Sequence, residues 1–471
     1  MPTIASAVEP RNRSASIGSV FVLTLGALDF GLEQSIIIPA LPSLAAHYGA
    51  SLNAIAWLAT GFLLASIVAV PLFGRLGDLF GKRRLLLISL GLFAVGSLIC
   101  ALTEAIELAI AGRVIQGLGA AVAPLAMGIA RDTLVPELLP RAIGAVVGAA
   151  MAGSGIGFLL SGVLVDAYSP ASIFWVLFAF AAVLLVAVFA LVDESPVRAR
   201  VPLDLPGAAL LTVGLVALLL AISKGDAWGW TSARIVGLFV ASIAVLTVFL
   251  LVERRAEQPL VDLGLLTARP FAQAHVCIAL FGFAFFIAVF LVPQIAAAPE
   301  ESGYGLGLSI KQVGLILLPT SIVAFVAGWV GGRTVDRVGP RLLAAAGSVF
   351  GVVGYVSLAL AHGSAVELAA GSAAVGVGWG LILTAIYPVV IRGSTTDKTG
   401  VAIGVNVVIR NTSAAVGTQV AFAILAGAGV VAGFTAEDGF TRGFVLGAVG
   451  AAVAIAVSML LPGRKRASAV A

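Results

Sequence analysis

The sequence predicts an all-α integral membrane protein with fourteen transmembrane helices. The chain of 471 residues is 60% hydrophobic and 11% charged, whereas soluble domains are about 25% charged. Its mean hydropathy is +1.13. The apolar runs are about 20 residues long, enough for a helix to cross a hydrocarbon core of about 30 Å. The polar segments between them are short, so no long soluble domain is expected.

The apolar runs define the predicted helices in chain order, and the seventh run is the shortest. Their approximate limits are 16–41, 54–73, 83–103, 106–130, 141–165, 171–192, 207–223, 232–252, 271–294, 311–332, 342–361, 365–391, 400–427 and 440–461. The polar start of the chain leads into the first run without a signal-peptide cleavage site. We therefore expect the first run to be kept as a membrane span.

The basic residues provide a test of this count, because Lys and Arg concentrate in cytoplasmic loops. With a cytoplasmic N-terminus, 21 of the 27 Lys and Arg residues fall in tails and loops on the cytoplasmic side. With an odd number of spans, the basic loops in the second half of the chain would no longer fall on the cytoplasmic side. The sequence therefore predicts a multi-pass protein of the inner or plasma membrane with both termini in the cytoplasm.

Several function classes are disfavoured by what the sequence lacks. It has no nucleotide-binding G-x-x-x-x-G-K-[ST] motif and no His/Cys cluster with metal-ligand spacing. No pairing of a nucleophile with a base supports an enzyme. The net charge of +4 is explained by basic loops that face an anionic leaflet, so it needs no nucleic acid. We expect no enzymatic activity, no metal and no other cofactor.

The loops after the second run of each half carry the same pattern. GRLGDLFGKR at 74–83 and GRTVDRVGPR at 332–341 share G-R-x-x-D-x-x-G-x-R at an offset of 258 residues. The glycines allow a turn and close helix approach, and the aspartates can accept from a helix N-terminus or an arginine. A plain basic loop would not explain the repeated glycines and aspartates. The predicted conformational-switch residues are Gly74, Asp78, Gly81, Lys82, Arg83, Gly332, Asp336, Gly339 and Arg341.

Two carboxylates lie inside the first run, where Asp29 and Glu33 are four positions apart and therefore on one helix face. Each acid would cost about 2.5–3.5 kcal/mol if it faced lipid, so both should face the protein interior. Low dielectric and mutual repulsion favour the protonated form, as a proton carrier requires. A permanently protonated pair, or a pair held by Arg113 on the fourth run, is the alternative.

These motifs resemble those of the major facilitator superfamily. The loop at 74–83 is similar to the family's G-x-L-[GA]-D-R-x-G-R-[KR] signature, and RVIQGLGAA at 113–121 is similar to its fourth-span motif. EQSIIIPALP at 33–42 resembles a first-span element of the fourteen-span drug:proton antiporters, with Glu33 in the place of an aspartate. Segments 303–319 and 404–419 are similar to actinobacterial multidrug efflux members.

The resemblance implies two six-helix bundles related by pseudo-two-fold symmetry, with two extra transmembrane helices between them. Residues 16–200 would form the N-terminal bundle, 201–256 the inserted hairpin and 257–461 the C-terminal bundle. Residues 1–15 and 462–471 would be cytoplasmic tails. The hairpin has no charge within its spans, so either lipid packing or a role in transport fits it equally.

Glycines on the fifth run keep the spacing of an antiporter motif, but Phe158 replaces its proline. Close helix packing is expected there, whereas the proline kink is missing, which weakens the case for export without excluding it. The predicted packing residues are Gln116, Gly117, Gly153, Gly157 and Gly162.

A substrate cavity is expected between the two bundles, near the middle of the membrane. Polar or aromatic side chains within the spans are candidates to line it, although helix packing explains the aromatic residues at least as well. The candidates are Trp57, Phe62, Phe158, Tyr387, Asn406, Arg410 and Asn411.

By this resemblance we expect a secondary transporter that works by alternating access. It would exchange protons for lipophilic small molecules, cations among them, with Glu33, Asp29 and Arg113 coupling the two fluxes. Import of a specific metabolite is the alternative, and a membrane sensor or scaffold is a third possibility. Its partners would be the substrate, protons and the lipid bilayer, and it would function as a monomer.

Overall fold

The structure, a computed structural model, describes residues 13–133, 139–195, 204–256, 259, 269–393, 399–431 and 434–463. The predicted tails at 1–15 and 462–471, and the predicted boundaries at 200–201 and 256–257, lie wholly or partly outside these residues.

All fourteen predicted runs fall on helices. Among the described residues, thirteen helices are long and apolar enough to cross a membrane, and the described part of a fourteenth includes a shorter apolar stretch at Ala152–Ala167. The helices are α1 (Arg13–Tyr48), α2 (Leu52–Phe80), α3 (Lys82–Leu102), α4 (Ile106–Leu118), α5 (Val122–Thr133), α6 (Leu139–Ala167), α7 (Ser172–Leu191), α8 (Leu205–Trp228), α9 (Ala233–Glu253), α11 (Arg269–Ala297), α12 (Ile310–Val338), α13 (Pro340–Leu360), α14 (Ala365–Gly393), α15 (Thr399–Gly427) and α16 (Glu437–Ser458).

The fourth run differs from the prediction of one continuous helix, because it is divided into α4 and α5 by a turn at residues 119–121. At this turn the chain presses against α3. A Cβ built on Gly119 would lie 2.5 Å from the backbone oxygen of Ser89, so only glycine permits the approach. Both helices still belong to one span, Ile106–Ala130.

The two repeated loops form the same kind of turn. Gly81 separates α2 from α3 with a φ of 109°, and Gly339 separates α12 from α13 with a φ of 89°. A residue with a side chain rarely adopts such angles. The repeat found in the sequence therefore marks equivalent corners of the two halves.

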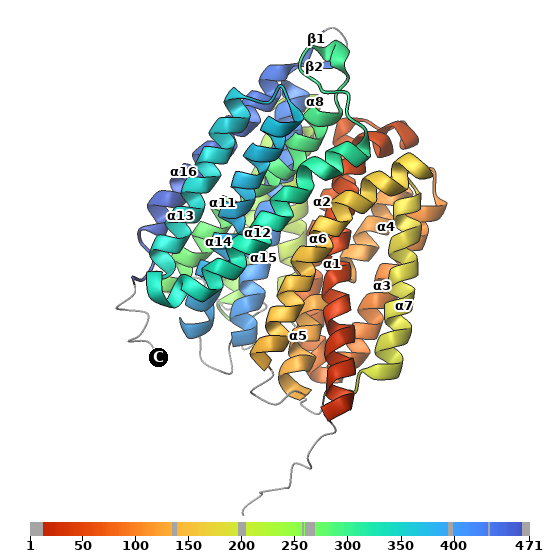
Figure 1. The fold of residues 1–471 in the computed structure, drawn as a ribbon, viewed down its shortest axis with the longest axis vertical. Coiled ribbons are helices and arrows are strands. Elements are labelled where there is room, and N and C mark those ends of the chain that lie inside the picture. Colours follow the sequence, from red (N-terminus) through yellow and green to blue (C-terminus); the bar gives the residue numbers. More distant parts are fainter. Residues whose placement is uncertain are drawn as a thin grey trace, which may run out of the picture.

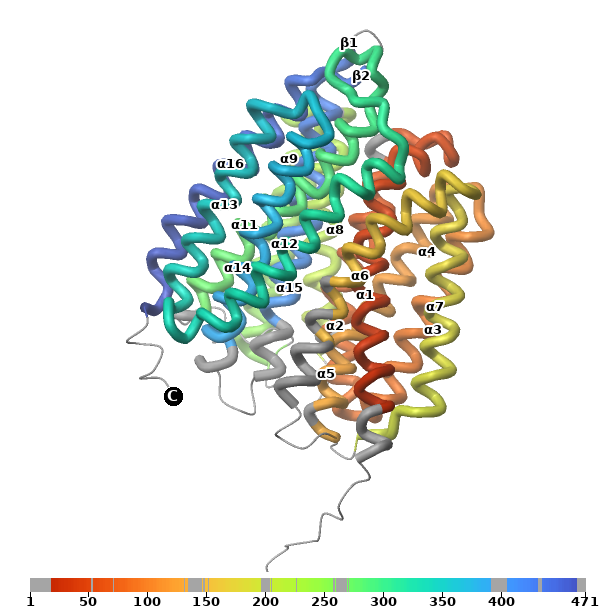
Figure 2. The backbone as a smooth tube through the Cα atoms, viewed as in Figure 1, coloured from red at the N-terminus to blue at the C-terminus, as the bar shows by residue number. Residues whose placement is uncertain are grey.

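Each half is a bundle of six spans (Figure 1). In the N-terminal half α1 packs on α6, α3 on α7 and α2 on α4. In the C-terminal half α13 and α12 pack on α14, and α11 packs on α15. Figure 2 shows the two halves side by side, red to yellow and green to blue. They meet where α6 packs on α12 and α2 packs on α15.

Glycines make the α1–α6 contact close. A Cβ on Gly153 would lie 2.1 Å from the oxygen of Leu28, and a Cβ on Gly157 would lie 2.7 Å from the oxygen of Leu32. On the far side of α6, a Cβ on Gly162 would lie 2.1 Å from the Cα of Lys311 on α12. Helix α6 is therefore packed backbone to backbone against both halves, as small residues permit in membranes.

The inserted helices α8 and α9 form a hairpin, in which the Ser242 hydroxyl donates to the oxygen of Gly214 at 2.8 Å. Helix α8 packs against α2 of one half and α15 of the other. Trp57 Nε1 on α2 donates to Ser223 Oγ on α8 at 3.2 Å. The hairpin therefore covers the junction between α2 and α15.

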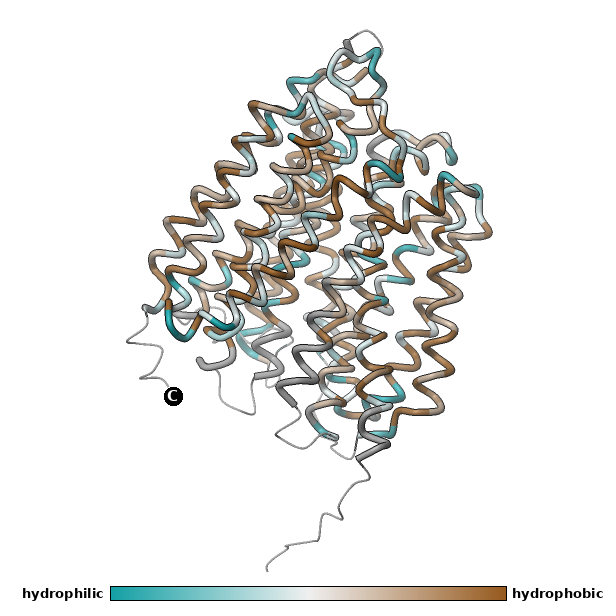
Figure 3. Tube along the Cα trace, in the orientation of Figure 1, coloured by the Kyte–Doolittle hydropathy of each residue, from teal (hydrophilic) through white to brown (hydrophobic). Residues whose placement is uncertain are grey.

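The start of α1 and the end of α16 lie at the same end of the molecule, which we call the termini face (Figure 1). The opposite face carries the short antiparallel strands β1 (Val430–Val431) and β2 (Phe434–Thr435). There the Tyr304 hydroxyl, next to the short helix Glu300–Ser302, donates to the oxygen of Thr435 at 2.7 Å. Figure 3 shows hydrophobic residues along the helices and many hydrophilic residues near their ends, as a membrane-spanning bundle requires.

Candidate functional site

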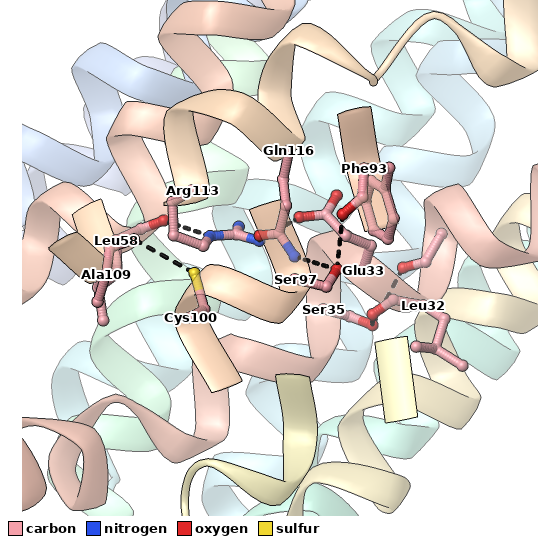
Figure 4. A network of polar contacts seen from close by, with 11 residues as sticks. Leu32, Glu33, Ser35, Leu58, Phe93, Ser97, Cys100, Ala109, Arg113 and Gln116 are labelled. Atoms are coloured by element: carbon pink, nitrogen blue, oxygen red, sulfur yellow. Dashed lines mark hydrogen bonds and ion pairs between the residues drawn. The ribbon is translucent and has the colours of Figure 1, made fainter. Parts of the chain in front are cut away.

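The centre of the N-terminal half holds an ion pair between α1 and α4. Arg113 Nη1 donates to Glu33 Oε1 at 2.5 Å. Glu33 is 0% exposed and Arg113 is 2% exposed. Because an unpaired charge buried at low dielectric is costly, each group stabilises the charge of the other. Figure 4 shows the two side chains pointing toward one another.

The guanidinium of Arg113 is fixed from several sides. Its Nε donates to the oxygen of Leu58 at 2.7 Å, and Nη1 also donates to Gln116 Oε1 at 2.7 Å. Gln116 Nε2 in turn donates to Ser97 Oγ at 2.7 Å (Figure 4). The network thus joins α1, α2, α3 and α4 around one cation.

Small residues in the sequence make this network possible. A Cβ on Gly117 would lie 2.4 Å from the oxygen of Phe62, and a Cβ on Gly96 would lie 2.5 Å from the oxygen of Gly112. Helices α2, α3 and α4 therefore approach closely around Arg113. The ring of Phe62 covers the guanidinium, with 4.7 Å from its centroid to Cζ.

Asp29 is not part of the ion pair. It is buried, and its Oδ1 has no hydrogen-bond partner among the described residues. The structure therefore brings Glu33 together with Arg113 and leaves Asp29 one turn away on the same helix.

A narrow pocket lies beside the network, at the interface of the two halves. The N-terminal half contributes Arg113, Gln34 and Phe62, and the C-terminal half contributes Phe286 and Thr418. Its remaining lining is apolar and consists of Ile37, Ile38, Leu41, Ala59, Leu63, Val289 and Phe290. A molecule larger than water would need the halves to part.

Of the predicted cavity residues, only Phe62 lines this pocket. Trp57 bonds to the inserted hairpin, and the backbone of Phe158 packs against Gly314 on α12. Tyr387 is half-buried, and Asn406 is fully buried with no hydrogen-bond partner for its amide among the described residues.

Two hydrogen bonds join α2 to α15 across the interface of the halves. Asn411 Nδ2 donates to Ser66 Oγ at 3.0 Å, and Gln419 Nε2 donates to Thr60 Oγ1 at 3.1 Å. Arg410 lies beside Asn411, with 3.4 Å between Nη2 and Oδ1. Of the predicted residues, Asn411 is therefore a contact between the halves.

An aromatic cluster behind the pocket was only partly visible in the sequence. The run FGFAFF at 281–286 supplies Phe281, Phe285 and Phe286 on α11, and Trp379 on α14 stacks on Phe285 with 4.6 Å between centroids. The spacing within α14 gives no signal that Trp379 would meet α11.

The switch loop of the N-terminal half is a network of ion pairs. Lys82 Nζ lies 2.7 Å from both Asp78 Oδ1 and Asp132 Oδ2. Asp132 also accepts from the Ser195 hydroxyl at 2.6 Å. The carboxylate of Glu194 accepts from the backbone nitrogen of Arg83 at 3.0 Å, which caps the start of α3. The sequence does not reveal Asp132 and Glu194 as partners of this loop, because neither is near the motif in the chain.

The switch loop of the C-terminal half has the same turn but other partners. Arg341 Nε donates to the oxygen of Leu461 at 2.9 Å. The neighbouring Arg333 stacks on Trp329, with 3.4 Å from Cζ to the ring centroid. A Cβ added to Gly74 or Gly332 would meet nothing within 4 Å. Asp336 also takes part in an interaction. The repeat therefore has the same backbone turn in both halves.

The described residues contain no group of three or more His, Cys, Asp or Glu that could hold a metal ion.

Two bundles of six spans, with a buried ion pair beside a pocket between them, define the class of polytopic membrane transporters. The chain belongs to the Major Facilitator Superfamily, whose sequence profile matches residues 23–418.

Bacterial relatives are similar over much of the chain. Multidrug resistance protein Stp of Mycobacterium tuberculosis is 30% identical over 409 residues, covering 85% of this chain and 73% of that protein. Multidrug resistance protein 3 of Bacillus subtilis is 30% identical over 318 residues, 66% of this chain and 60% of that protein. The tetracenomycin C resistance and export protein of Streptomyces glaucescens is 30% identical over 324 residues, 68% of this chain and 59% of that protein. The match thus spans only about three fifths of the length of the last two.

Solved structures share the fold. The nucleoside transporter NupG has a TM-score of 0.64 at 12% identity, covering 94% of this chain and 99% of that one. The human organic anion transporter MFSD10 has a TM-score of 0.61 at 17% identity, with 93% and 99% covered. At these identities the likeness concerns the fold alone.

Proposed function

We propose that the protein is a secondary transporter that exports lipophilic small molecules in exchange for protons. The observation that carries this proposal is the buried Glu33–Arg113 pair beside a pocket that both halves line. A carboxylate with one counter-ion can be ionised while the pair is intact and can take up a proton when access to water changes. Names of relatives that include multidrug resistance and export support the direction.

The packing supports alternating access as the mechanism. Helix α6 meets α12 near the opposite face, where Gly162 touches Lys311 and Phe158 touches Gly314. We infer that the structure represents a state closed at the opposite face. The halves would part at that face when the substrate leaves.

We also propose the orientation of the protein in the membrane, its oligomeric state and its partners. The termini face would be the cytoplasmic side of the cell membrane, a monomer would suffice, and the partners would be the substrate, protons and lipid. The boundaries of the bundles at 16–200 and 257–461, and of the hairpin at 201–256, stay predictions.

Flux measurements in proteoliposomes test the proposal. We expect an imposed pH gradient to drive substrate movement against the proton movement, and Glu33→Gln to abolish this drive. Asp438→Asn changes an exposed acid that pairs with Arg442, and serves as the matched control. Substrate flux that is indifferent to the pH gradient in the unaltered protein would reject proton exchange.

Import is a second candidate, and one observation favours it. Helix α6 runs without proline through Phe158, so the kink that the antiporter motif would supply is absent. The sign of the coupled flux decides, since movement of substrate in the same direction as protons indicates import.

A further inference from the structure

The inserted hairpin lies against both halves of the molecule. Helix α8 packs on α2 of the N-terminal half and on α15 of the C-terminal half. Helix α9 packs on α8 and exposes many of its apolar side chains. If the halves move relative to one another, α2 and α15 separate or slide. The hairpin can then keep its contacts unchanged with only one of them.

One polar anchor joins the hairpin to α2 near the opposite face. Trp57 Nε1, close to the start of α2, donates to Ser223 Oγ at 3.2 Å, close to the end of α8. Ser223 is 2% exposed. An indole N–H in apolar surroundings is costly without an acceptor, so this hydrogen bond resists separation of the two helices.

A second anchor lies at the other end of α2, near the termini face. Arg75 is attracted electrostatically by Glu253 and Asp204 of the hairpin, as well as by Asp78 on its own helix. Glu253 is the last residue of α9 and is 2% exposed. Asp204 precedes α8, and its Oδ1 accepts from the backbone nitrogen of Gly207 at 2.8 Å.

Gly207 brings the two hairpin acids together. A Cβ built on it would overlap Asp204 Oδ2 and would lie 2.7 Å from Glu253 Oε1. Two carboxylates this close, one of them buried, need a nearby cation, and Arg75 of the N-terminal half provides one.

The contact with α15 is of a different kind. The described residues of α8 and α15 form no hydrogen bond or ion pair with each other. The polar residues of α15 that reach the N-terminal half bond to α2 instead, Asn411 to Ser66 and Gln419 to Thr60. Apolar contacts between helices can be exchanged for contacts with lipid at little cost, whereas hydrogen bonds within the membrane cannot. The surface between α8 and α15 can therefore slide.

We propose that the inserted hairpin is mechanically part of the N-terminal half, so that α8 and α9 move with α2 and slide along α15. The two anchors on α2, at Trp57 and Arg75, are about five helical turns apart, roughly 27 Å, and hold the hairpin at both ends. The hairpin then keeps the junction of α2 and α15 covered while the halves move, which closes the path between them to lipid. This inference rests on the alternating access of the proposed function.

Distances between spin labels test the proposal in protein reconstituted into lipid nanodiscs. Cysteines replace three exposed residues at the opposite face, two at a time: Ala227 near the end of α8, Tyr168 just after α6, and Leu360 at the end of α13. The native Cys100 and Cys277 are 0% exposed, so a reagent added in water should leave them unlabelled. Pulsed electron paramagnetic resonance gives the distances at acidic and alkaline pH, with and without Gly162→Val.

The distance between Tyr168 and Leu360 should shift as the halves part. The distance between Ala227 and Leu360 should shift with it, whereas that between Ala227 and Tyr168 should stay the same. A shift between Ala227 and Tyr168 would overturn the proposal, even where the halves are seen to part. If the distance between Tyr168 and Leu360 never shifts, alternating access is rejected, and the moving hairpin with it.

A variant without the two anchors tests what holds the hairpin. Trp57→Phe with Glu253→Gln removes the N–H donor at one end and one acid at the other. The distance distribution between Ala227 and Tyr168 should broaden, and flux should fall. Trp175→Phe with Asp438→Asn, at exposed positions outside the hairpin, is the matched control.

A misfolded variant is recognised because all three distance distributions would be lost, not the hairpin distances alone. If the distribution between Ala227 and Tyr168 stays narrow without the anchors, the two anchors do not attach the hairpin and the proposal is wrong. If it broadens but flux is unchanged, covering the junction is not what the hairpin contributes to transport.

Discussion

Arg113 on α4 and Glu33 on α1 form a buried ion pair, 80 residues apart in sequence and 2.5 Å apart between Nη1 and Oε1. The pair connects the first and fourth spans of the N-terminal half, and Arg113 alone reaches the pocket. Loss of either residue should therefore destabilise the protein, and loss of Glu33 should also remove the pH drive of transport.

The strength of the pair can be measured by a double-mutant cycle. Removing one partner of a buried pair leaves an uncompensated charge and costs about 3–5 kcal/mol, so Arg113→Gln and Glu33→Gln should each destabilise the protein. The double variant should lose much less than the sum of the two, because no charge is left unpaired. Thermal unfolding in detergent measures this, and additive losses would show that the two groups are not coupled.

Asp29→Asn should be tolerated. Asp29 has no counter-ion among its described hydrogen-bond partners, so a neutral amide removes the cost of an ionisable group at low dielectric. We expect unchanged or higher thermal stability and flux that still follows the pH gradient. Loss of the pH drive in Asp29→Asn, with a folded protein, would assign the coupling to both acids.

Lys82→Gln should damage the switch loop. Lys82 is 4% exposed and pairs with both Asp78 and Asp132, so its loss removes a buried cation that the two acids share. A loss of stability of about 3 kcal/mol is expected, together with slower flux. Lys224→Gln is the matched control, because Lys224 lies outside both loops. Equal effects of the two changes would contradict a special role for Lys82.

Trp57→Phe should loosen the inserted hairpin. The change keeps an aromatic ring but removes the N–H that bonds to Ser223, which costs about 1 kcal/mol. Ser223→Ala in addition should cost little more, since the bond is already absent. Trp175→Phe, at an exposed position on α7, is the control. Thermal unfolding measures all of these variants, and a further full loss in the double variant would mean that the two side chains act separately.

Gly162→Val should hinder closure at the opposite face. A Cβ there would meet the Cα of Lys311, and overpacking costs about 1–3 kcal/mol. The closed state should become roughly tenfold less populated, or rarer, with a matching loss of flux. Gly237→Val is the control, because an added Cβ at Gly237 meets nothing within 4 Å. A cysteine placed in the pocket lining reports on this closure through its labelling by a reagent added from the opposite face. If labelling is not increased in Gly162→Val, transport does not depend on this closure.

The sequence alone determined the spans and the two corner loops. Apolar runs of membrane length must become helices in lipid, because every backbone polar group has to be satisfied within its own segment. The repeat at 74–83 and 332–341 predicted two equivalent turns, and Gly81 and Gly339 have the positive φ that such turns require. These features are local in the chain, so composition and spacing reveal them.

Only the tertiary structure decided which polar groups meet. The motif singled out Glu33 and left open whether Arg113 holds both acids, and the structure shows that only Glu33 bonds to Arg113 although both acids are buried. Trp57 bonds to the hairpin and does not line the pocket. Asp132 on α5 and Glu194, just after α7, contact the switch loop from distant parts of the chain. The physical reason is that partners across a bundle depend on which helix faces come into contact. Glycines such as Gly117 and Gly153 allow those faces to approach closely. No pattern within a single helix carries that information.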